Sequence, residues 1–455
     1  MFLIIRRLFA LAAIVVVVTA ASGCAESTRP KATGKGDIRG INAIVTAPDV
    51  TFLIEERGLG NVSFKASSGF STYDDLPYNF NFDVLLPGDL ERTRVATQFI
   101  DVVLDTEYTV VLTGTIANPS TFVWEDPLRE WSGTETVSEV FFAHLAPSIG
   151  ELDVYFAAPG TAPVLGQAVG SLTNGNRLPG MDFEAAQYEV ILTPKDDPAT
   201  TIYQSVPFGT TAQNQVTIAV FDPDPSVPGN VAASFIGRGS TSVVLADANS
   251  PPQVRTLHAA FGTENFDGYF NSDFSNVIFP DIGFQELSPY ADVTSGTPLF
   301  TATPVGNSGA VIHENEILVS VGTRRTIVLA GQPGGLLYLA LVDSARSLET
   351  FPVIRILNAS LNTEVLDIYM VEPGTPIDDV IFPLFRGLPS LLDTGFTDSA
   401  QGMLELTVTL FGEKTPIATP LLLDLANGDV FDIVIVDTVD PAIVETLVFD
   451  AQQAP

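Results

Sequence analysis

The sequence predicts an all-β protein: tandem immunoglobulin-like antiparallel β-sandwich domains that follow an N-terminal lipoprotein signal peptide. Three observations predict this fold class. Short runs of Val, Ile, Thr, Phe and Tyr are separated by turn residues along the chain, which is typical of strands. No stretch after Cys24 shows a capped helical period of useful length. A strand motif also returns four times at intervals of about 100 residues, the usual size of such a sandwich.

The recurring motif combines a polar residue at the end of an apolar strand with an aspartate beside the next strand. The aspartates are Asp49, Asp153, Asp267 and Asp367. The preceding polar residues are Asn42, His144, His258 and Asn358. The two positions lie nine residues apart in the last three copies and seven apart in the first, so we expect a shorter loop in the first copy. Matching offsets in four copies indicate one unit repeated four times.

Length and composition agree with several domains. A chain of 455 residues is too long for one ordinary core, and its 46% hydrophobic content is enough for each of several domains to fold. We expect a signal peptide over 1–23, a lipidated cysteine and flexible tether over 24–36, and sandwich repeats over 37–136, 137–250, 251–350 and 351–455.

The N-terminus carries the strongest local signal. Arg6 and Arg7 precede an unbroken apolar run over 8–18, in the order that a signal peptide shows. The small residues that follow, ending at Cys24, resemble the lipobox of bacterial lipoproteins. This resemblance implies cleavage before Cys24, a diacylglycerol on its thiol, and attachment to a membrane through that lipid. Cys24 is the only cysteine of the chain, so no intramolecular disulfide competes for the thiol.

The residue after the cysteine bears on the location. Ala25, rather than Asp, follows Cys24, and the resemblance to lipoproteins then implies sorting to the outer membrane of a Gram-negative source. We therefore expect an exported protein of the cell envelope. The alternative is an uncleaved transmembrane helix, because the charge-free run over 8–25 is at the lower edge of a membrane span.

The charge balance narrows the classes of partner. The chain has 21 Lys and Arg against 54 Asp and Glu, a formal net charge of -33. This excess repels phosphate, so nucleic acid is excluded as a partner, because that affinity depends on Lys and Arg at the backbone. Such acidity fits a soluble exported surface or one that collects divalent cations.

The repeated pattern resembles a known family. An apolar strand, His or Asn, Ala, a Pro-rich loop and Asp-Val-Tyr, followed later by Tyr-Thr-Val-Val, is similar to the bacterial domain-of-unknown-function 4397 family. The resemblance covers Asp37 to about Ala451 in four copies and is clearest over 144–156 and 108–112. It implies secreted or cell-surface β-sandwich repeats, and it implies no activity.

The histidines give no catalytic or zinc-binding motif. His144 and His258 occupy the position that asparagine fills in the other copies, which indicates a hydrogen-bonding cap at a strand end rather than a titrating base. His313 is followed by Glu314, but residue 317 is Ile, so the second histidine of a zinc motif is missing. We expect no catalytic residue and no cofactor.

Two further features are candidates for binding. The four repeated aspartates either cap backbone loops or hold calcium; capping is favoured because other ligand oxygens are not repeated with them. Trp131 follows the last strand of the first copy, where it either packs against the second copy or binds an envelope protein or a glycan.

Two functional classes follow. In the first, the chain is a non-enzymatic surface lipoprotein whose repeats act as a structural spacer or as a ligand-binding, adhesive array. In the second, it is a carboxylate-dependent hydrolase that acts on an envelope or extracellular polymer. The first class is favoured because all copies share the same scaffold residues, whereas an enzyme would show one copy with a distinct polar cluster.

Overall fold

A computed structural model describes residues 31–86, 89, 91–344 and 346–452. The expected signal peptide, Cys24 and the first part of the tether lie outside these residues. Within them there is a single short 3-10 helix, η1 (Ile377–Asp379), and all other regular elements are strands. No helix in this part of the chain has the length and apolar character needed to cross a membrane.

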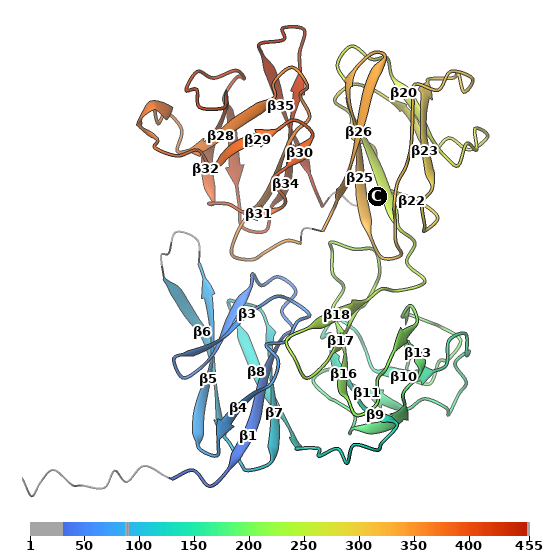
Figure 1. The fold of residues 1–455 in the computed structure, drawn as a ribbon, viewed down its shortest axis with the longest axis vertical. Coiled ribbons are helices and arrows are strands. Elements are labelled where there is room, and N and C mark those ends of the chain that lie inside the picture. Colours follow the sequence, from blue (N-terminus) through green and yellow to red (C-terminus); the bar gives the residue numbers. More distant parts are fainter. Residues whose placement is uncertain (1–30, 87–88, 90, 345, 453–455) are drawn as a thin grey trace, which may run out of the picture.

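The strands form eight sheets in the described part of the chain, and these lie face to face in four sandwiches (Figure 1). Each sandwich encloses a core cluster of buried side chains, such as the one around Phe52 and Phe80 in the first. The prediction of an all-β chain of sandwich repeats is therefore confirmed. We number the repeats 1 to 4 along the chain and call the sheet that faces a neighbouring repeat the inner sheet.

Repeat 1 has two four-stranded sheets. Its strands are β1 (Lys35–Asn42), β2 (Val50–Ile54), β3 (Arg57–Val62), β4 (Ser71–Asp74), β5 (Pro77–Leu85), β6 (Arg92–Asp101), β7 (Thr106–Gly114) and β8 (Pro119–Pro127). The inner sheet has the order β4-β1-β7-β8, and the outer sheet has the order β3-β2-β5-β6.

Repeat 2 has two five-stranded sheets. Its strands are β9 (Val137–Leu145), β10 (Leu152–Ala157), β11 (Gly170–Leu172), β12 (Met181–Glu184), β13 (Gln187–Pro194), β14 (Tyr203–Gln204), β15 (Phe208–Gly209), β16 (Gln215–Phe221), β17 (Ala232–Ile236) and β18 (Ser242–Leu245). The inner sheet has the order β12-β9-β16-β17-β18. The outer sheet has the order β11-β10-β13-β14, with β15 also paired to β13.

Repeat 3 returns to two four-stranded sheets. Its strands are β19 (Gln253–Ala259), β20 (Phe266–Phe270), β21 (Phe279–Ile282), β22 (Ala291–Asp292), β23 (Leu299–Pro304), β24 (His313–Glu316), β25 (Arg324–Gln332) and β26 (Gly335–Val342). The inner sheet has the order β22-β19-β25-β26, and the outer sheet has the order β21-β20-β23-β24.

Repeat 4 completes the chain. Its strands are β27 (Val353–Asn358), β28 (Val365–Val371), β29 (Phe385–Pro389), β30 (Leu392–Asp393), β31 (Thr397–Asp398), β32 (Gly402–Leu410), β33 (Leu421–Leu425), β34 (Val430–Asp437) and β35 (Val444–Asp450). The inner sheet has the order β30-β27-β34-β35, with β31 also paired to β27, and the outer sheet has the order β29-β28-β32-β33.

Every repeat contains one parallel strand pair, which the sequence analysis did not predict. The first strand of each repeat runs parallel to a late strand of the same sheet: β1 to β7, β9 to β16, β19 to β25 and β27 to β34. A parallel pair needs a long crossover connection. The intervening strands, most of which belong to the outer sheet, provide it.

The inner sheets are buried on both faces. All seven residues of β16 are buried, and so are all six of β27. Half of these side chains line the core of their own repeat, and the other half contact the neighbouring repeat. This double burial explains why such strands are nearly continuous apolar runs without alternation of polar and apolar residues.

The four repeats associate in two pairs. One buried cluster joins repeats 1 and 2 through Ile41 and Val111 on one side and Ala219 and Phe221 on the other. An equivalent cluster joins repeats 3 and 4. Each pair is thus a stack of four sheets, and the two pairs lie end to end along the long axis (Figure 1).

Candidate functional site

The repeated Asn or His fixes the loop that leaves the first strand of each repeat. Oδ1 of Asn42 and of Asn358 accepts the backbone N–H two residues later. Nδ2 donates to a carbonyl in the third strand of the repeat, β3 at 3.0 Å for Asn42 and β29 at 3.3 Å for Asn358. Nδ1 of His144 and of His258 accepts the same N–H at 3.2 Å, while Nε2 faces a loop carbonyl at 3.0 and 3.3 Å. All four side chains are buried. The position therefore holds a side chain that accepts one bond and donates another.

These contacts determine the charge state of the two histidines. Because Nδ1 accepts an N–H and Nε2 donates to a carbonyl, each ring is the neutral Nε2–H tautomer. Burial lowers the pKa of His144 and of His258, and the carbonyl beside Nε2 opposes this only in part. Neutral rings with fixed hydrogen bonds are loop caps and have no free nitrogen for acid-base chemistry.

Three of the four repeated aspartates also hold loops. Asp153, Asp267 and Asp367 are buried in the second strand of their repeats. In each, Oδ2 accepts the N–H of a residue with left-handed φ just beyond the neighbouring strand, at 2.8 to 2.9 Å; these residues are Asp196, Gly306 and Gly412. Oδ1 accepts a bond of 2.5 to 2.9 Å from the opposite side, from the Ser171 hydroxyl and from the N–H groups of Asp281 and Gly387. One carboxylate thus ties together the ends of two flanking strands.

The first copy corrects the predicted repeat position. Asp49 is exposed, precedes β2, and accepts a bond of 2.6 Å from the Ser63 hydroxyl. The strand register instead places Thr51 where the other copies have aspartate, because Thr51 pairs with Asp83 as Asp153 pairs with Thr193. Thr51 lies nine residues after Asn42, so the loop of the first copy is not shorter. The prediction failed because the sequence Asp-Val-Thr-Phe at 49–52 resembles Asp-Val-Tyr-Phe at 153–156 but begins two residues before the equivalent position.

Other acidic pairs are engaged in structure too. Asp222 accepts bonds from the N–H and hydroxyl of Ser148, and Asp224 forms a buried ion pair of 2.5 Å with Lys65 of repeat 1. Among the described residues, no group of three His, Cys, Asp or Glu is placed to hold a metal ion. Both oxygens of each buried repeat aspartate accept a protein donor, so these carboxylates tie loops together as caps do.

The two tryptophans lie between repeats 1 and 2. Trp131 is half-buried in the linker that joins these repeats, with the guanidinium of Arg129 3.9 Å from its ring centre. Arg129 in turn pairs with Asp182 of repeat 2 at 3.0 Å. Trp124 is also half-buried, and it packs against the cluster between the repeats rather than in the core of repeat 1.

Buried arginines cross the interface of each pair, and the sequence analysis missed them. In pair 1–2, Arg39 is 3% exposed and donates to Thr109 of its own repeat at 3.0 Å and to Thr217 of repeat 2 at 2.8 Å. Burial lowers the pKa of Arg39 to about 9, so the guanidinium is still protonated at neutral pH. This interface therefore buries a charge among neutral acceptors.

Pair 3–4 uses a four-membered ionic cluster at the same place. Arg355 donates to Asp432 and to Asp343, both at 2.7 Å, and Arg255 donates to Asp432 at 2.9 Å. All four side chains are at most 6% exposed. Burial opposes the charge of Arg355, but the carboxylates of Asp432 and Asp343 outweigh it and raise the pKa of Arg355.

The two interfaces are related position by position. Arg39, Arg255 and Arg355 each stand three residues before the repeated Asn or His, and in repeat 2 this position is Phe141. Asp126, the counterpart of Asp343, is paired instead with Arg177, at 2.6 Å, whose guanidinium lies over Phe141. Arginine at a fixed offset in three of four copies was the sequence signal that could have revealed these contacts.

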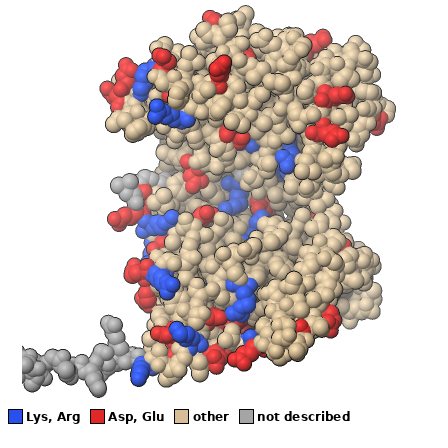
Figure 2. Space-filling view, viewed as in Figure 1, with Lys and Arg blue, Asp and Glu red and all other residues tan. Residues whose placement is uncertain are grey.

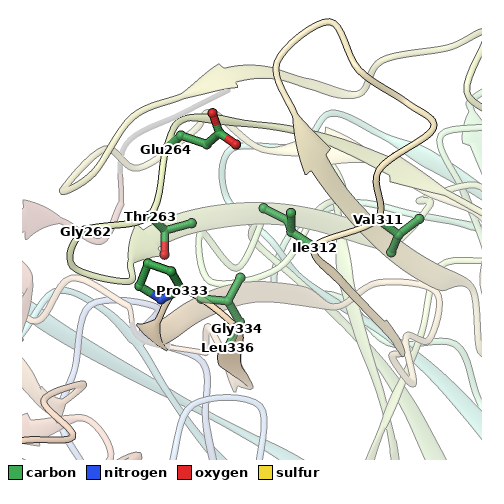
Figure 3. A pocket seen from close by; sticks show the side chains of 8 residues that line it. All are labelled: Gly262, Thr263, Glu264, Val311, Ile312, Pro333, Gly334 and Leu336. Carbon is green, nitrogen blue, oxygen red and sulfur yellow. The ribbon is translucent and has the colours of Figure 1, made fainter.

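The outer surface is acidic and has no continuous basic patch on the face in view. Figure 2 shows acidic side chains spread over both pairs, with basic side chains among them. A groove of about 450 Å³ lies on repeat 3 and is lined by loop backbone and apolar side chains such as Val311 and Leu336 (Figure 3). Glu264 is the only charged residue in its lining.

These features define a class of protein: a tandem array of all-β sandwiches whose shared polar residues serve the fold. A family model described as a domain of unknown function (DUF4397) matches residues 36–155 and 252–369, more than half of the chain. The chain belongs to this family. Each match begins at the first strand of a repeat pair and ends in the second strand of the following repeat.

Other comparisons are weak. No curated protein matches the chain. Among solved structures, the Bacillus anthracis TIE protein is similar over 89% of this chain and 69% of that chain, with 8% sequence identity and a TM-score of 0.15. A TM-score this low says nothing about function.

Proposed function

We propose that this chain is a non-enzymatic, membrane-anchored protein of the cell envelope that acts as a stiff spacer and presents its far end to a partner. The observation that carries the proposal is the use of the repeated polar residues. The polar residues that recur among the repeats cap loops, tie the ends of strands together or make contacts between repeats. A scaffold role requires such uniform use, whereas catalysis requires one repeat with a distinct polar cluster.

Stiffness is supported by the contacts between repeats. The ionic cluster of pair 3–4 and the apolar cluster of pair 1–2 are both buried, which is unlike the wet, open contacts of domains that move freely. The two pairs also touch: Arg346, in the linker between repeats 3 and 4, donates to the carbonyl oxygens of Val45 and, at 3.0 Å, of Ala47 in repeat 1. Four repeats held in this way form one block and do not move independently.

The position of the first strand supports a role as a spacer. β1 begins at the end of pair 1–2 that points away from pair 3–4 (Figure 1). A lipid on Cys24, followed by a tether of about a dozen residues spanning at most about 40 Å, would hold this end near the membrane. Pair 3–4 would then lie at the far end of the block, available to an envelope protein or a glycan.

Metabolic labelling tests the anchor. Cells that express the full chain are given an alkyne fatty acid, and the wild type is compared with Cys24→Ser. We expect label in the membrane fraction for the wild type and none for the variant. Equal labelling of both proteins would refute lipidation at Cys24, and recovery of both in the soluble fraction would refute anchoring.

A pull-down tests the presenting role. The soluble chain that begins at Asp37 is immobilised and offered envelope extract and glycans, once with calcium and once with chelator. We expect partners to be retained under both conditions, because the buried repeat aspartates are held by protein N–H and hydroxyl donors and tie their loops without a cation. Loss of all partners on chelation would favour a calcium-dependent array instead.

A further inference from the structure

The contact between the two repeat pairs shows how one end of a pair binds an arginine. Residues 346–349, in the linker between repeats 3 and 4, lie on the loop 43–49 of repeat 1. The Arg346 guanidinium donates to the carbonyl oxygens of Val45 and Ala47, and the backbone N–H of Glu349 donates to that of Thr46 at 2.9 Å. The guanidinium also lies 5.3 Å from the centre of the Phe64 ring. Three successive carbonyls and one aromatic face thus hold a short segment through one arginine side chain and one backbone N–H.

The same loop recurs at the free end of pair 3–4. His258 occupies the position of Asn42, and equal spacing follows in both repeats, so Phe261, Gly262 and Thr263 correspond to Val45, Thr46 and Ala47. The aromatic ring recurs as well. Phe64 and Phe284 each precede a residue with left-handed φ, Lys65 at 69° and Gln285 at 68°.

At this free end no described residue takes the place of the linker. The carbonyl of Thr263, which corresponds to that of Ala47, faces the His258 ring. The carbonyl oxygens of Phe261 and Gly262, which correspond to those of Val45 and Thr46, accept no hydrogen bond from the described residues. No described cation lies over Phe284, whose ring has the Phe261 ring edge-on at 5.6 Å. Both loop residues are part of a groove of about 260 Å³ that also includes Val439, which is 86% exposed. Figure 3 shows the adjoining groove, which shares Gly262 with it.

Two differences from repeat 1 define the chemistry of the free end. Exposed Glu264 stands where repeat 1 has Pro48, which adds a negative charge beside the carbonyls. Pro333 stands where repeat 1 has Ile116, whose N–H donates to the Glu349 carboxylate, and proline has no N–H to offer. The site thus keeps a free carbonyl and an aromatic ring like those that contact Arg346. It lacks the backbone N–H that contacts the Glu349 carboxylate.

The matching loop of repeat 4 is a useful contrast. There the carbonyl oxygens of Ser360 and Thr363 accept bonds of 2.7 and 2.8 Å from the Ser390 hydroxyl. The carbonyl oxygens of Leu361 and Asn362, which correspond to those of Phe261 and Gly262, accept no bond from the described residues, so free carbonyls occur in both repeats. Ser390 stands where repeat 3 has Phe284, because Leu391, like Gln285, has a left-handed φ and donates its N–H to the carbonyl of the capping residue. Repeat 4 thus lacks the aromatic ring, and the combination of free carbonyls with a ring is a feature of repeat 3.

We propose that the loop 260–264 with Phe284 and the Val439 turn is a docking site for a short segment of a partner protein that inserts one arginine. The segment would be held as residues 346–349 are held in pair 1–2. A planar guanidinium can donate to two carbonyls at once and stack on a ring, which an ammonium group cannot do equally well. This inference depends on the proposed function only for the orientation of the free end away from the membrane.

A second copy of the chain is the competing occupant. Its corresponding segment is the linker between repeats 1 and 2, where Arg129 stands three residues after Asp126 as Arg346 stands three after Asp343. That linker lies at the end where the tether leaves the block (Figure 1). An anchored copy would keep it near the membrane, far from the free end of its neighbour, so a separate partner fits better.

A peptide with the sequence of residues 343–352 is the probe. Its binding to the soluble chain from Asp37 is measured by fluorescence anisotropy, beside peptides that carry Arg346→Ala or Arg346→Lys. We expect Arg346→Ala to weaken binding about tenfold or more, because charge-assisted bonds to the carbonyls are lost, and Arg346→Lys to be intermediate. Equal affinity of all three peptides would overturn the proposal.

Protein variants locate the site. We expect Glu264→Lys to weaken binding of the arginine peptide several-fold through like-charge repulsion. Glu372→Lys is the matched control, because it makes the same charge change on an exposed residue at the other end of repeat 4 and should leave affinity unchanged. An equal effect of both variants would overturn the assignment.

Sedimentation of the same proteins examines the competing occupant. If the soluble chain self-associates and Glu264→Lys abolishes this, the site belongs to a second copy and the partner proposal is wrong. We expect a monomer at the concentrations used for peptide binding. These measurements need no lipid, so they can fail while labelling at Cys24 succeeds, and the reverse also holds.

Discussion

The two repeat pairs have the same backbone architecture but different chemistry around the arginine that stands three residues before the repeated Asn or His. Ion pairs join the repeats in both, and in pair 1–2 these include Lys65 with Asp224 and Arg177 with Asp126. We call the contacts of Arg39 in pair 1–2 the neutral interface and the cluster of Arg255 and Arg355 in pair 3–4 the ionic interface. Pair 1–2 buries one arginine, Arg39, among threonines and a carbonyl, whereas pair 3–4 buries two arginines and two aspartates in contact. Phe141 replaces the second arginine in pair 1–2, and Arg177 arrives from a loop to pair with Asp126. A sandwich interface of this kind thus accepts either solution, provided that each buried carboxylate has a cation.

Breaking the ionic interface should have the largest effect. Arg355→Met leaves Asp432 and Asp343 buried with only Arg255 beside them, and removal of one partner from such a cluster costs about 3–5 kcal/mol. Hydrogen exchange in β27 and β34, read by mass spectrometry, should become much faster. Exposed Arg386→Met is the control and should change stability by less than about 0.5 kcal/mol. Unchanged exchange in Arg355→Met would show that the cluster does not hold this pair together.

Removing a turn tie should rank second. Asp367→Ala in pair 3–4 and Asp153→Ala in pair 1–2 each remove a buried carboxylate that accepts two bonds, which should cost about 2–4 kcal/mol in urea unfolding. Asp49→Ala serves as the comparison and should cost well under 1 kcal/mol, because Asp49 is exposed. If Asp49→Ala were as costly as the other two, our correction of the repeat position to Thr51 would be wrong.

The strand content was predictable, and the contacts between repeats were not. Apolar runs bounded by turn residues indicate strands from local chemistry alone. Continuous apolar runs such as 216–220 also indicate a strand that is buried on both faces. They do not indicate which part of the protein covers the second face. The pairing of repeats depends on single polar residues such as Arg39 and Arg255, and their partners in the neighbouring repeat, Thr217 and Asp432, lie 178 and 177 residues away.

The repeated polar residues were predictable in kind and only partly in place. Alternation of His and Asn at one position indicated a cap, and in the structure both side chains accept the N–H two residues later. Their second bonds go to different carbonyls, on the third strand for Asn and in the following loop for His. Asp49 was assigned to the repeated position from sequence similarity alone. A shift of two residues along a strand keeps a side chain on the same face of the sheet, so the alternation of polar and apolar residues could not reveal the error. Only the pairing of Thr51 with Asp83 distinguishes the two registers.

A third substitution compares the neutral interface with the ionic one. Arg39→Met in pair 1–2 removes donors to three neutral acceptors and leaves no carboxylate unpaired at this site, so we expect a loss of about 1–2 kcal/mol, less than for Arg355→Met. Trp124 packs against this interface, so its fluorescence in urea unfolding reports on the pair. A loss as large as that of Arg355→Met would mean that the buried charge, and not its pairing, sets the cost.

The smallest expected effect is a dependence of stability on pH, which each pair carries through one histidine. Burial lowers the pKa of His144 and His258 below the value of about 6.5 in the unfolded chain. The unfolded state therefore binds more protons in acid, so the contribution of each neutral ring is complete above pH 6.5 and is lost as pH falls. The slope approaches about 1.4 kcal/mol per pH unit for each histidine. Between pH 7 and 5, wild-type stability should fall more than that of His144→Asn or His258→Asn.

Asparagine accepts the same N–H in repeats 1 and 4 and donates to a different carbonyl, so His144→Asn and His258→Asn should fold and keep the cap while they lose the titration. The reverse exchange is the sharper control. Asn42→His places a third histidine in an equivalent buried position, and it should make pair 1–2 more sensitive to acid than the wild type. If Asn42→His and His144→Asn shift the pH dependence in the same direction, the cap does not govern it, and other buried groups such as His313, whose pKa burial also lowers, must do so.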